Sequence, residues 1–126
     1  MKTTITTKAA PQAIGPYAQA VRAGQWVFCS GQIGLNPATG ELIAGGVVPE
    51  TERVLDNLRA VLAAAGLGVE HVVRTTIYLV DLGDFTRVNE IYGRAFTAPF
   101  PARATVGVAA LPRGARVEID AIAVAE

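Results

Sequence analysis

ETERVLDNLRAVLAAAGLGVEHVVRTTIYLV, residues 50–80, changes from the apolar period of a helix to that of a strand. Apolar side chains recur at helical spacing as far as Ala65, which predicts an amphipathic helix over Glu50–Ala65. Pro49 and the acidic Glu50 suit the N-terminus of this helix. Gly66 can adopt the left-handed conformation that ends a helix. A helix that leads into a strand indicates a layered fold in which the two pack together.

The strand predicted over Val72–Val80 has two distinct faces. One face carries Val73, Thr75, Ile77 and Leu79, and the other carries Arg74, Thr76 and Tyr78. A second helix follows, with Asp84 as its N-cap and an end before Pro99. Its apolar stripe consists of Phe85, Val88, Ile91, Tyr92 and Phe96.

Short strand-like runs flank these elements. Tyr17–Arg22 and Trp26–Ile33 are predicted to form a hairpin through Ala23-Gly24-Gln25. Ala104–Ala109 and Arg116–Val124 are predicted to be the last two strands, separated by a turn at residues 111–114. Two helices on one face of a small mixed sheet would bury both helical stripes, so we expect an α+β sandwich.

Arg103 follows Phe100-Pro101-Ala102 at the start of an apolar strand. A guanidinium presents five donors in a planar fork that matches a carboxylate, and it stays charged at working pH. Arg103 is therefore a candidate residue for binding the carboxylate of a ligand. An internal ion pair with an Asp or Glu of the same chain is an equally good explanation of this segment alone.

The partner of Arg103 depends on the register of the last two strands. If they pair about Leu111-Pro112, Asp120 lies opposite Arg103 and Glu118 lies opposite Thr105. An arginine and a carboxylate would then share one face. Centring the turn on Arg113-Gly114 instead would spoil this arrangement, and both registers remain open.

Length and composition favour one domain over residues 1–126. Hydrophobic residues make up 51% of the chain, and 11 basic side chains balance 11 acidic ones. With no basic excess, we expect no general affinity for nucleic acid. So apolar a chain could bury part of its surface in an oligomer.

The chain has one cysteine, Cys29, and one histidine, His71, so it has no Cys/His cluster of zinc spacing and no internal disulfide. Cys29 lies in an apolar run and is expected to be a small core residue. Ser30 lacks the partners of a serine triad. Residues 1–8 have no signal-peptide core, and no run of apolar residues is long enough to span a membrane, so we expect a reducing, cytoplasmic location.

Five short motifs occur in one order along almost the whole chain. They are Ile14-Gly15-Pro16-Tyr17, Cys29-Ser30-Gly31-Gln32, Leu55-Asp56-Asn57-Leu58 with Val88-Asn89, Phe100-Pro101-Ala102-Arg103, and Val117-Glu118-Ile119-Asp120-Ala121-Ile122-Ala123. In this combination the sequence resembles the RidA (YjgF-type) family of reactive intermediate deaminases. The presence of Arg103 resembles the active branch rather than the relatives that lack this arginine.

The resemblance implies a homotrimer of chorismate-mutase-like subunits, with ligand clefts between neighbours and no cofactor or metal. The implied reaction is hydrolysis of 2-imino acids to 2-keto acids and ammonia. Arg103 would hold the substrate carboxylate and Glu118 would position and activate water. The residues expected to line the pocket are Tyr17, Ser30, Gly31, Asn89 and Thr105. Some members have cysteine where this chain has Thr105, so a thiol is not required here, although a hydroxyl can still donate a hydrogen bond.

Two other functions remain open. A non-catalytic carboxylate-binding or chaperone-like protein would also use Arg103. A ribonuclease is less well supported, because the chain is neutral and Lys2 and Lys8 are its only lysines. Retention of Glu118 favours catalysis.

Overall fold

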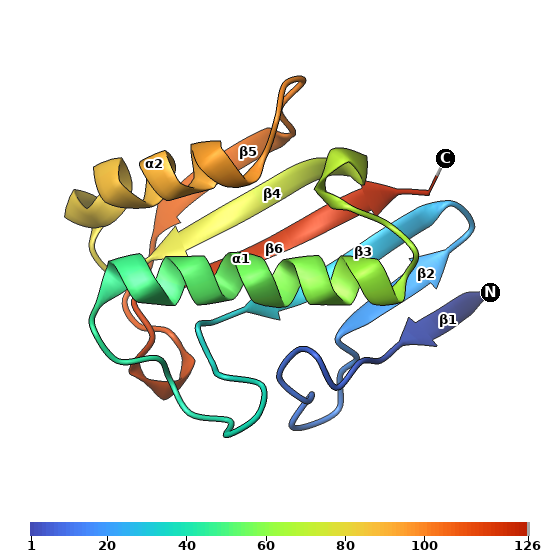
Figure 1. Cartoon of the computed structure of the whole chain (residues 1–126), viewed down its shortest axis with the longest axis horizontal. Helices are drawn as coiled ribbons and strands as arrows, with labels where there is room; N and C mark the ends of the chain where they lie inside the picture. Colours follow the sequence, from blue (N-terminus) through green and yellow to red (C-terminus); the bar gives the residue numbers. More distant parts are fainter. Residues whose placement is uncertain (126) are drawn as a thin grey trace.

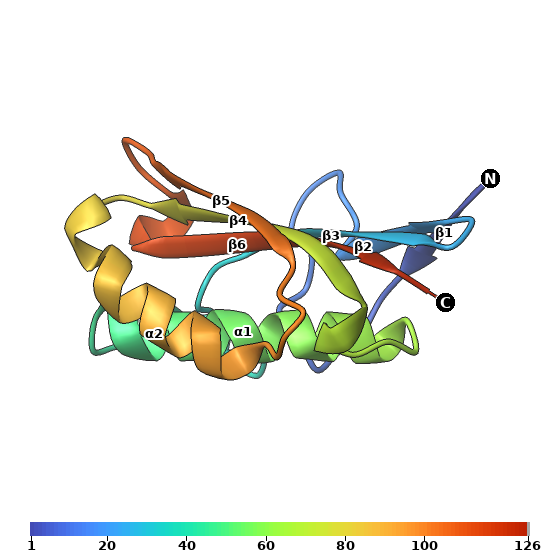
Figure 2. The same ribbon diagram turned by 90° about the horizontal axis from the view of Figure 1, so that it is seen from above.

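Both helices lie on the same face of one six-stranded mixed sheet (Figure 1 and, seen from above, Figure 2). This computed structural model describes residues 1–125. The strands run in the order β1-β2-β3-β6-β4-β5, and only the β4–β5 pair is parallel. Their bounds are β1 Lys2–Ile5, β2 Ala20–Ala23, β3 Trp26–Gln32, β4 Val72–Leu79, β5 Ala102–Gly107 and β6 Val117–Val124. The helices are α1 (Val47–Ala64) and α2 (Phe85–Ala95), and single 3-10 turns occupy Val69–His71, Leu82–Asp84 and Pro112–Gly114. The expected α+β layer fold is confirmed.

Helix α1 begins three residues earlier than the predicted Glu50, at Val47. Gly46 precedes it with φ 96°. Because the helix begins at Val47, Pro49 lies inside the first turn, where its missing N–H costs no helical hydrogen bond. At the other end Gly66 has φ 77°, as predicted. The Gly66 N–H donates to the Ala63 carbonyl and the Leu67 N–H donates to the Leu62 carbonyl, which is the Schellman arrangement.

Strand β4 departs from strict alternation at its first residues. Val72 pairs with Ala123 of β6 and Arg74 pairs with the next residue, Ile122, so Val73 is an extra residue in a bulge. The bulge leaves Val73 exposed and turns Val72 inward. The predicted face of Val73, Thr75, Ile77 and Leu79 is therefore wrong at Val73 and confirmed at the other three positions, which are fully buried.

Helix α2 starts after Asp84 as predicted, but the side chain of Asp84 does not cap it. Asp84 is buried and pairs with Arg87, while Asp81 accepts the Gly83 N–H of the preceding turn. The predicted stripe is confirmed, since Val88, Ile91, Tyr92 and Phe96 are buried and Phe85 packs against the core.

The N-terminal strands differ in detail from prediction. The hairpin of β2 and β3 forms at the expected turn, but β2 begins at Ala20 rather than Tyr17. Residues before Ala20 instead form a loop. Strand β1 was not predicted, because three of its four residues are exposed and only Ile5 faces the core, so it has little apolar pattern.

Strands β5 and β6 are not neighbours, contrary to the pairing considered from the sequence. Strand β4 lies between them, with β5 parallel to it on one side and β6 antiparallel on the other. Thr105 and Glu118 are therefore not opposite each other. The turn at Pro112–Gly114 leads β6 back across β4 instead of folding it against β5.

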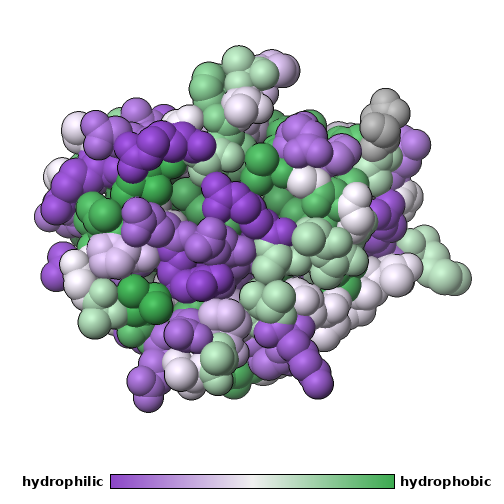
Figure 3. All heavy atoms as spheres, in the orientation of Figure 1, coloured by the Kyte–Doolittle hydropathy of each residue, from purple (hydrophilic) through white to green (hydrophobic). Residues whose placement is uncertain are grey.

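The core fills the space between the sheet and the two helices. Hydrophilic side chains cover much of the outer surface of the helices, as the space-filling view from the helix side shows (Figure 3). The largest fully buried apolar side chains are Leu62, Ile77, Leu79, Ile119, Val27, Val54, Val61, Val88 and Val117. Within residues 1–125, no helix is both long and apolar enough to cross a membrane.

Two glycine substitutions test this description of the helices, one at the end of α1 and one inside α2. We expect Gly66→Ala to lower the free energy of unfolding by about 1 kcal/mol, because its φ of 77° suits an L side chain poorly. Gly93→Ala lies within α2, where an added Cβ would meet nothing within 4 Å, and should raise the free energy of unfolding by about 0.5 kcal/mol. Urea unfolding at fixed protein concentration measures both. A shift of the same sign in both variants would contradict the assignment.

Candidate functional site

Arg103 lies on edge strand β5, on the side of the sheet that faces helix α2. Its Nη1 donates a 2.7 Å hydrogen bond to Oδ1 of Asn89. The guanidinium carbon stands 4.9 Å from the ring centre of Tyr92 and 5.4 Å from that of Phe85. Stacking on aromatic rings orients a guanidinium without neutralising it. Arg103 is thus held in place while most of its donors remain available.

No carboxylate in the described part of the chain forms an ion pair with Arg103. The ion pairs there are Arg59–Asp56, Arg87–Asp84 and the contact of His71 with Glu70. The internal salt bridge considered from the sequence is therefore absent from residues 1–125. An oriented and uncompensated guanidinium is suited to bind an anion from outside the chain.

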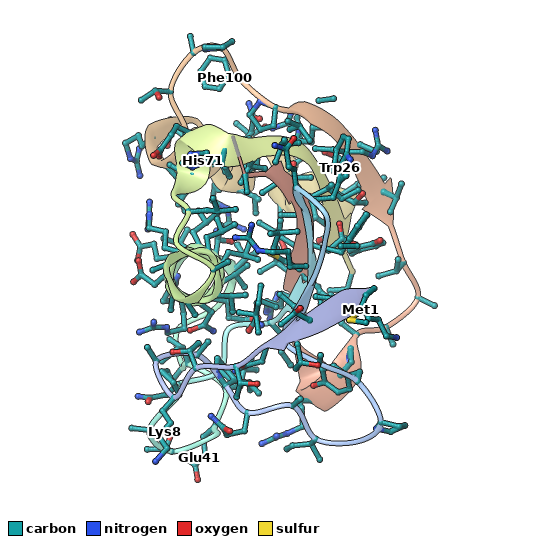
Figure 4. All side chains as sticks on the ribbon, turned by 90° about the vertical axis from the view of Figure 1, so that its right-hand side faces the viewer. Met1, Lys8, Trp26, Glu41, His71 and Phe100 are labelled. Atoms are coloured by element: carbon teal, nitrogen blue, oxygen red, sulfur yellow. The ribbon has the colours of Figure 1, made fainter. Side chains whose placement is uncertain are left out.

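The surface beside Arg103 is hollowed. An open depression of about 440 Å³ is lined by Asn89, Tyr92, Gly93, Phe100, Pro101 and Arg103. Phe100 is 58% exposed and lies at the tip of the loop between α2 and β5 (Figure 4). The hollow combines apolar surface with one cation and polar side chains, which fits a small carboxylate.

Glu118 lies at the start of β6 and lines a different pocket, of about 350 Å³. Loop residues form most of its walls. The lining consists of Pro11, Gln12, Ile14, Tyr17, Gln19, Gly31, Gln32, Ile33, Leu35, Pro112, Arg113 and Glu118. Three predicted site residues, Tyr17, Gly31 and Glu118, are therefore brought together here.

Gly31 makes room for the Glu118 carboxylate. A Cβ on Gly31 would collide with Oε2, Cδ and Cγ of Glu118. The pairing of β3 with β6 slips by one residue between Cys29 and Gln32, so Ser30 and Gly31 lie in a bulge, and Gly31 is the residue beside the carboxylate. Any larger residue at position 31 would force the Glu118 side chain out of this place, so the glycine matters through close approach and not through an unusual φ.

The walls of the Glu118 pocket are tied to the fold by buried side chains. Asn57 of α1 is completely buried and donates hydrogen bonds to the carbonyls of Ile33 and Leu35. Glu50 of α1 accepts the Arg116 N–H at 2.8 Å, just before β6. Helix α1 thereby holds the two segments that approach Glu118 from either side.

The pKa of Glu118 is raised, first by burial and second by the negative charge of Asp120. Asp120 is two residues along β6, on the same face, and accepts a 3.0 Å hydrogen bond from the Tyr78 hydroxyl. That hydrogen bond is the main cause of a raised pKa at Tyr78. A carboxylate with a raised pKa is a better proton acceptor once it is ionised.

Arg103 and Glu118 lie on opposite faces of the sheet. In the register, Arg103 is level with Thr75 of β4, and Glu118 is level with Tyr78. Side chains alternate along a strand, so positions three apart point to opposite faces. The strands β5 and β6 are also separated by β4, or about 10 Å. A small ligand cannot touch both groups within one chain.

The remaining predicted site residues divide between the two faces. Asn89 contacts Arg103, and Thr105 lies two residues along the same strand, on the same side and partly buried. Ser30 is next to Gly31, but its hydroxyl donates to the Ala18 carbonyl at 2.6 Å. Tyr17 is 54% exposed at the mouth of the Glu118 pocket.

Several residues around these groups were not predicted. Phe85 and Tyr92 were predicted only as core residues of α2, and the Arg103 guanidinium also stacks on their rings. Gln19 and Arg113 line the Glu118 pocket without having been singled out. The helical stripe could not reveal the stacking, since it depends on the place of β5 beside β4.

Cys29 and His71 play no part in either pocket. Burial, with a smaller effect from Asp120, raises the pKa of the Cys29 thiol to about 11, as expected for a core residue. His71 Nδ1 accepts the Gly68 N–H at 3.0 Å and so closes a local turn. Across residues 1–125 there is no cluster of His, Cys, Asp and Glu that could hold a metal ion.

Comparison with known proteins adds independent evidence. A family profile described as endoribonuclease L-PSP matches residues 7–125. The chain is 67% identical to Protein DfrA of Myxococcus xanthus over 117 residues, which covers 91% of this chain and 89% of that protein. It is 54% identical to the mouse 2-iminobutanoate/2-iminopropanoate deaminase over 120 residues, covering 95% of this chain and 89% of the mouse protein.

A solved structure has the same fold. Escherichia coli TdcF with bound serine superimposes with a TM-score of 0.94 at 43% identity, over 98% of this chain and 99% of that chain. The architecture described above is therefore shared with a protein crystallised with an amino acid.

One substitution tests the electrostatics of Glu118. We expect Asp120→Asn to lower the pKa of Glu118 but to leave it above its ordinary value, because burial is the larger cause and stays in place. Carbon-13 NMR of labelled glutamate side chains measures this titration. Asp56→Asn, which removes an exposed carboxylate of α1, is the control and should leave Glu118 unchanged. An unchanged pKa in Asp120→Asn would contradict the coupling.

Proposed function

Since the chain belongs to the family described as endoribonuclease L-PSP, also called the RidA (YjgF-type) family, we propose that it hydrolyses 2-imino acids to 2-keto acids and ammonia. The observation that carries this proposal is the pair of half-sites, an oriented free arginine and a partly buried glutamate with a raised pKa. Two relatives that are 54% and 50% identical to this chain are named as deaminases of two short imino acids.

Arg103 binds the substrate carboxylate in this proposal. Asn89, Tyr92 and Phe85 fix the guanidinium, so little side-chain freedom is lost when the ligand binds. Serine, which the structure of TdcF contains, carries the same α-carboxylate as the proposed substrates. A held carboxylate leaves the imine carbon in a defined place, which is the main requirement for attack by water.

Glu118 accepts a proton from that water. The water oxygen bonds to the carbon of the protonated imine while Glu118 takes one water proton, and the C=N electron pair moves to nitrogen, which gives a neutral carbinolamine. Glu118 returns that proton to the nitrogen, the C–N bond breaks and ammonia leaves, and the hydroxyl proton passes to solvent as the C=O bond of the keto acid forms. A protonated imine is already electrophilic, so neither a covalent nucleophile nor a cofactor is required. General-base help of this kind contributes about 100- to 10,000-fold.

The complete site needs two copies of the chain. Arg103 and Glu118 face away from each other within one copy, so one copy must supply the arginine and its neighbour the glutamate. A homotrimer with clefts between neighbours, as the family resemblance implies, meets this requirement. The cleft would join the hollow beside Arg103 to the pocket around Tyr17, Gly31 and Glu118 of the next copy.

The sheet face without helices supports such an assembly. Trp26 and Phe28 of β3 and Val106 of β5 point to this face and are 48%, 43% and 40% exposed. Trp26 lies on the far side of the sheet from α1 in Figure 4. Large exposed apolar side chains on one face mark an interaction surface. Burying this face between copies would also remove further water from the region of Glu118.

Imine hydrolysis is tested directly with an amino-acid oxidase that generates the 2-imino acid in place, and with semicarbazide that competes for it. We expect the protein to speed imine loss. Arg103→Ala should abolish the effect, and Glu118→Gln should reduce it about 100- to 10,000-fold while 2-keto acid binding persists. Arg94→Ala and Glu90→Gln, which change exposed residues of α2, are matched controls. Binding without turnover in the wild type would favour a carboxylate-binding protein instead, and RNA cleavage would favour a ribonuclease.

Mixing two inactive variants tests whether the site is shared. Arg103→Ala and Glu118→Gln subunits refolded together in equal amounts should regain about a quarter of wild-type activity, because one in four random neighbour pairs brings an intact arginine to an intact glutamate. Each variant refolded alone should stay inactive. Failure of mixed samples to recover, when native mass spectrometry shows oligomers that contain both variants, would place the whole site within one copy.

A further inference from the structure

Gln19 is a buried polar residue that lies immediately before β2 and is only 3% exposed. Its side-chain oxygen accepts the Thr7 N–H at 2.7 Å. Its side-chain nitrogen faces the carbonyls of Thr7, Ala10 and Pro11 at 3.0, 3.3 and 2.7 Å. The Gln19 carboxamide thus supplies hydrogen-bond partners to residues 7–11, which have no strand partner. Moving these residues away would leave a buried amide without hydrogen bonds, which is costly.

The backbone of the same segment is fixed to the strand that carries Gly31. The Gln19 carbonyl accepts the Ser30 N–H at 3.0 Å, and the Ser30 hydroxyl donates to the Ala18 carbonyl. Gln19 therefore joins the bulged end of β3 through its backbone to the loop before β2 through its side chain. Displacement of either side would break several hydrogen bonds together.

The loop held by Gln19 forms one wall of the Glu118 pocket. Pro11, Gln12, Ile14 and Tyr17 line that pocket, although Ile14 is 77% exposed. Contacts at the tip of the loop are weak, since the Ile14 N–H reaches the Tyr17 hydroxyl only at 3.4 Å. The tip has little packing of its own, so its position depends on the anchored part of the loop.

We propose that Gln19 is a positioning residue, which holds the loop of residues 7–17 against the Glu118 pocket and so sets how tightly the substrate binds. Although Gln19 lines the pocket, its polar atoms are occupied by the loop backbone, so it acts by fixing the positions of Tyr17 and Ile14. This inference rests on the proposed function. It assigns to Gln19 an effect on substrate affinity that a purely structural residue would not have.

Gln19→Leu removes all four side-chain hydrogen bonds at similar volume. We expect KM for the 2-imino acid, and Kd for 2-oxobutanoate measured by calorimetry, to rise about tenfold, while kcat stays within about threefold. Hydrogen exchange of the amides of residues 7–17 should speed up by about tenfold or more, with the rest of the chain little changed. Gln19→Met is uncharged, unbranched and of similar length, removes the same hydrogen bonds, and is measured in parallel in case the leucine variant does not fold.

Thr51→Val is the matched control. Thr51 is fully buried in α1, its hydroxyl donates to the Val47 carbonyl, and it lines neither pocket. Its loss should lower stability without changing KM, Kd or exchange in the loop. Faster loop exchange with unchanged KM and Kd in the Gln19 variants, or no change in loop exchange, would overturn the proposal. A wild-type protein without imine hydrolysis would disprove the proposed function instead, and 2-oxobutanoate binding and loop exchange would still decide the role of Gln19.

Discussion

The pairing of β4 with β5 on one edge and β6 on the other determines where both candidate groups lie. Parallel pairing sets Arg103 level with Thr75, and antiparallel pairing sets Glu118 level with Tyr78. Because side chains alternate along each strand, this register alone directs the arginine beneath α2 and the glutamate away from the helices. A slip of one residue in the β4–β6 pairing would turn Glu118 into the core, and a slip in the β4–β5 pairing would turn Arg103 away from α2; burial of Ile77 and Ile119 opposes a slip between β4 and β6.

Satisfied polar groups inside the molecule hold irregular backbone near Glu118. Asn57 and Glu50 act from α1, and Gln19 acts from the start of the hairpin. Each of these side chains is nearly or wholly buried. Loops that cannot use sheet hydrogen bonds are thereby given fixed partners, and removal of one partner leaves buried carbonyls or amides unpaired.

Local patterns in the sequence predicted the local structure well. Helical spacing located α1 and α2, Gly66 predicted a helix end, and Gly24 predicted the hairpin, because each depends on neighbouring residues. Long-range pairing was beyond those patterns. Neither register considered for the last two strands placed β4 between them. The sequence of residues 72–74 also gave no sign of the bulge that exposes Val73. Arg103 was singled out from the chemistry of its own segment, and the roles of the other candidate site residues came from the family resemblance. Their division between two faces became visible only with the strand order.

Cys29 has a practical consequence for protein chemistry. Its buried thiol has a pKa of about 11, so at neutral pH roughly one molecule in ten thousand carries the reactive thiolate. Because Cys29 is the only cysteine of the chain, a second one introduced on an exposed loop would be labelled almost alone by maleimide reagents. Fluorophores or spin labels could therefore be attached at chosen positions without first removing the native thiol.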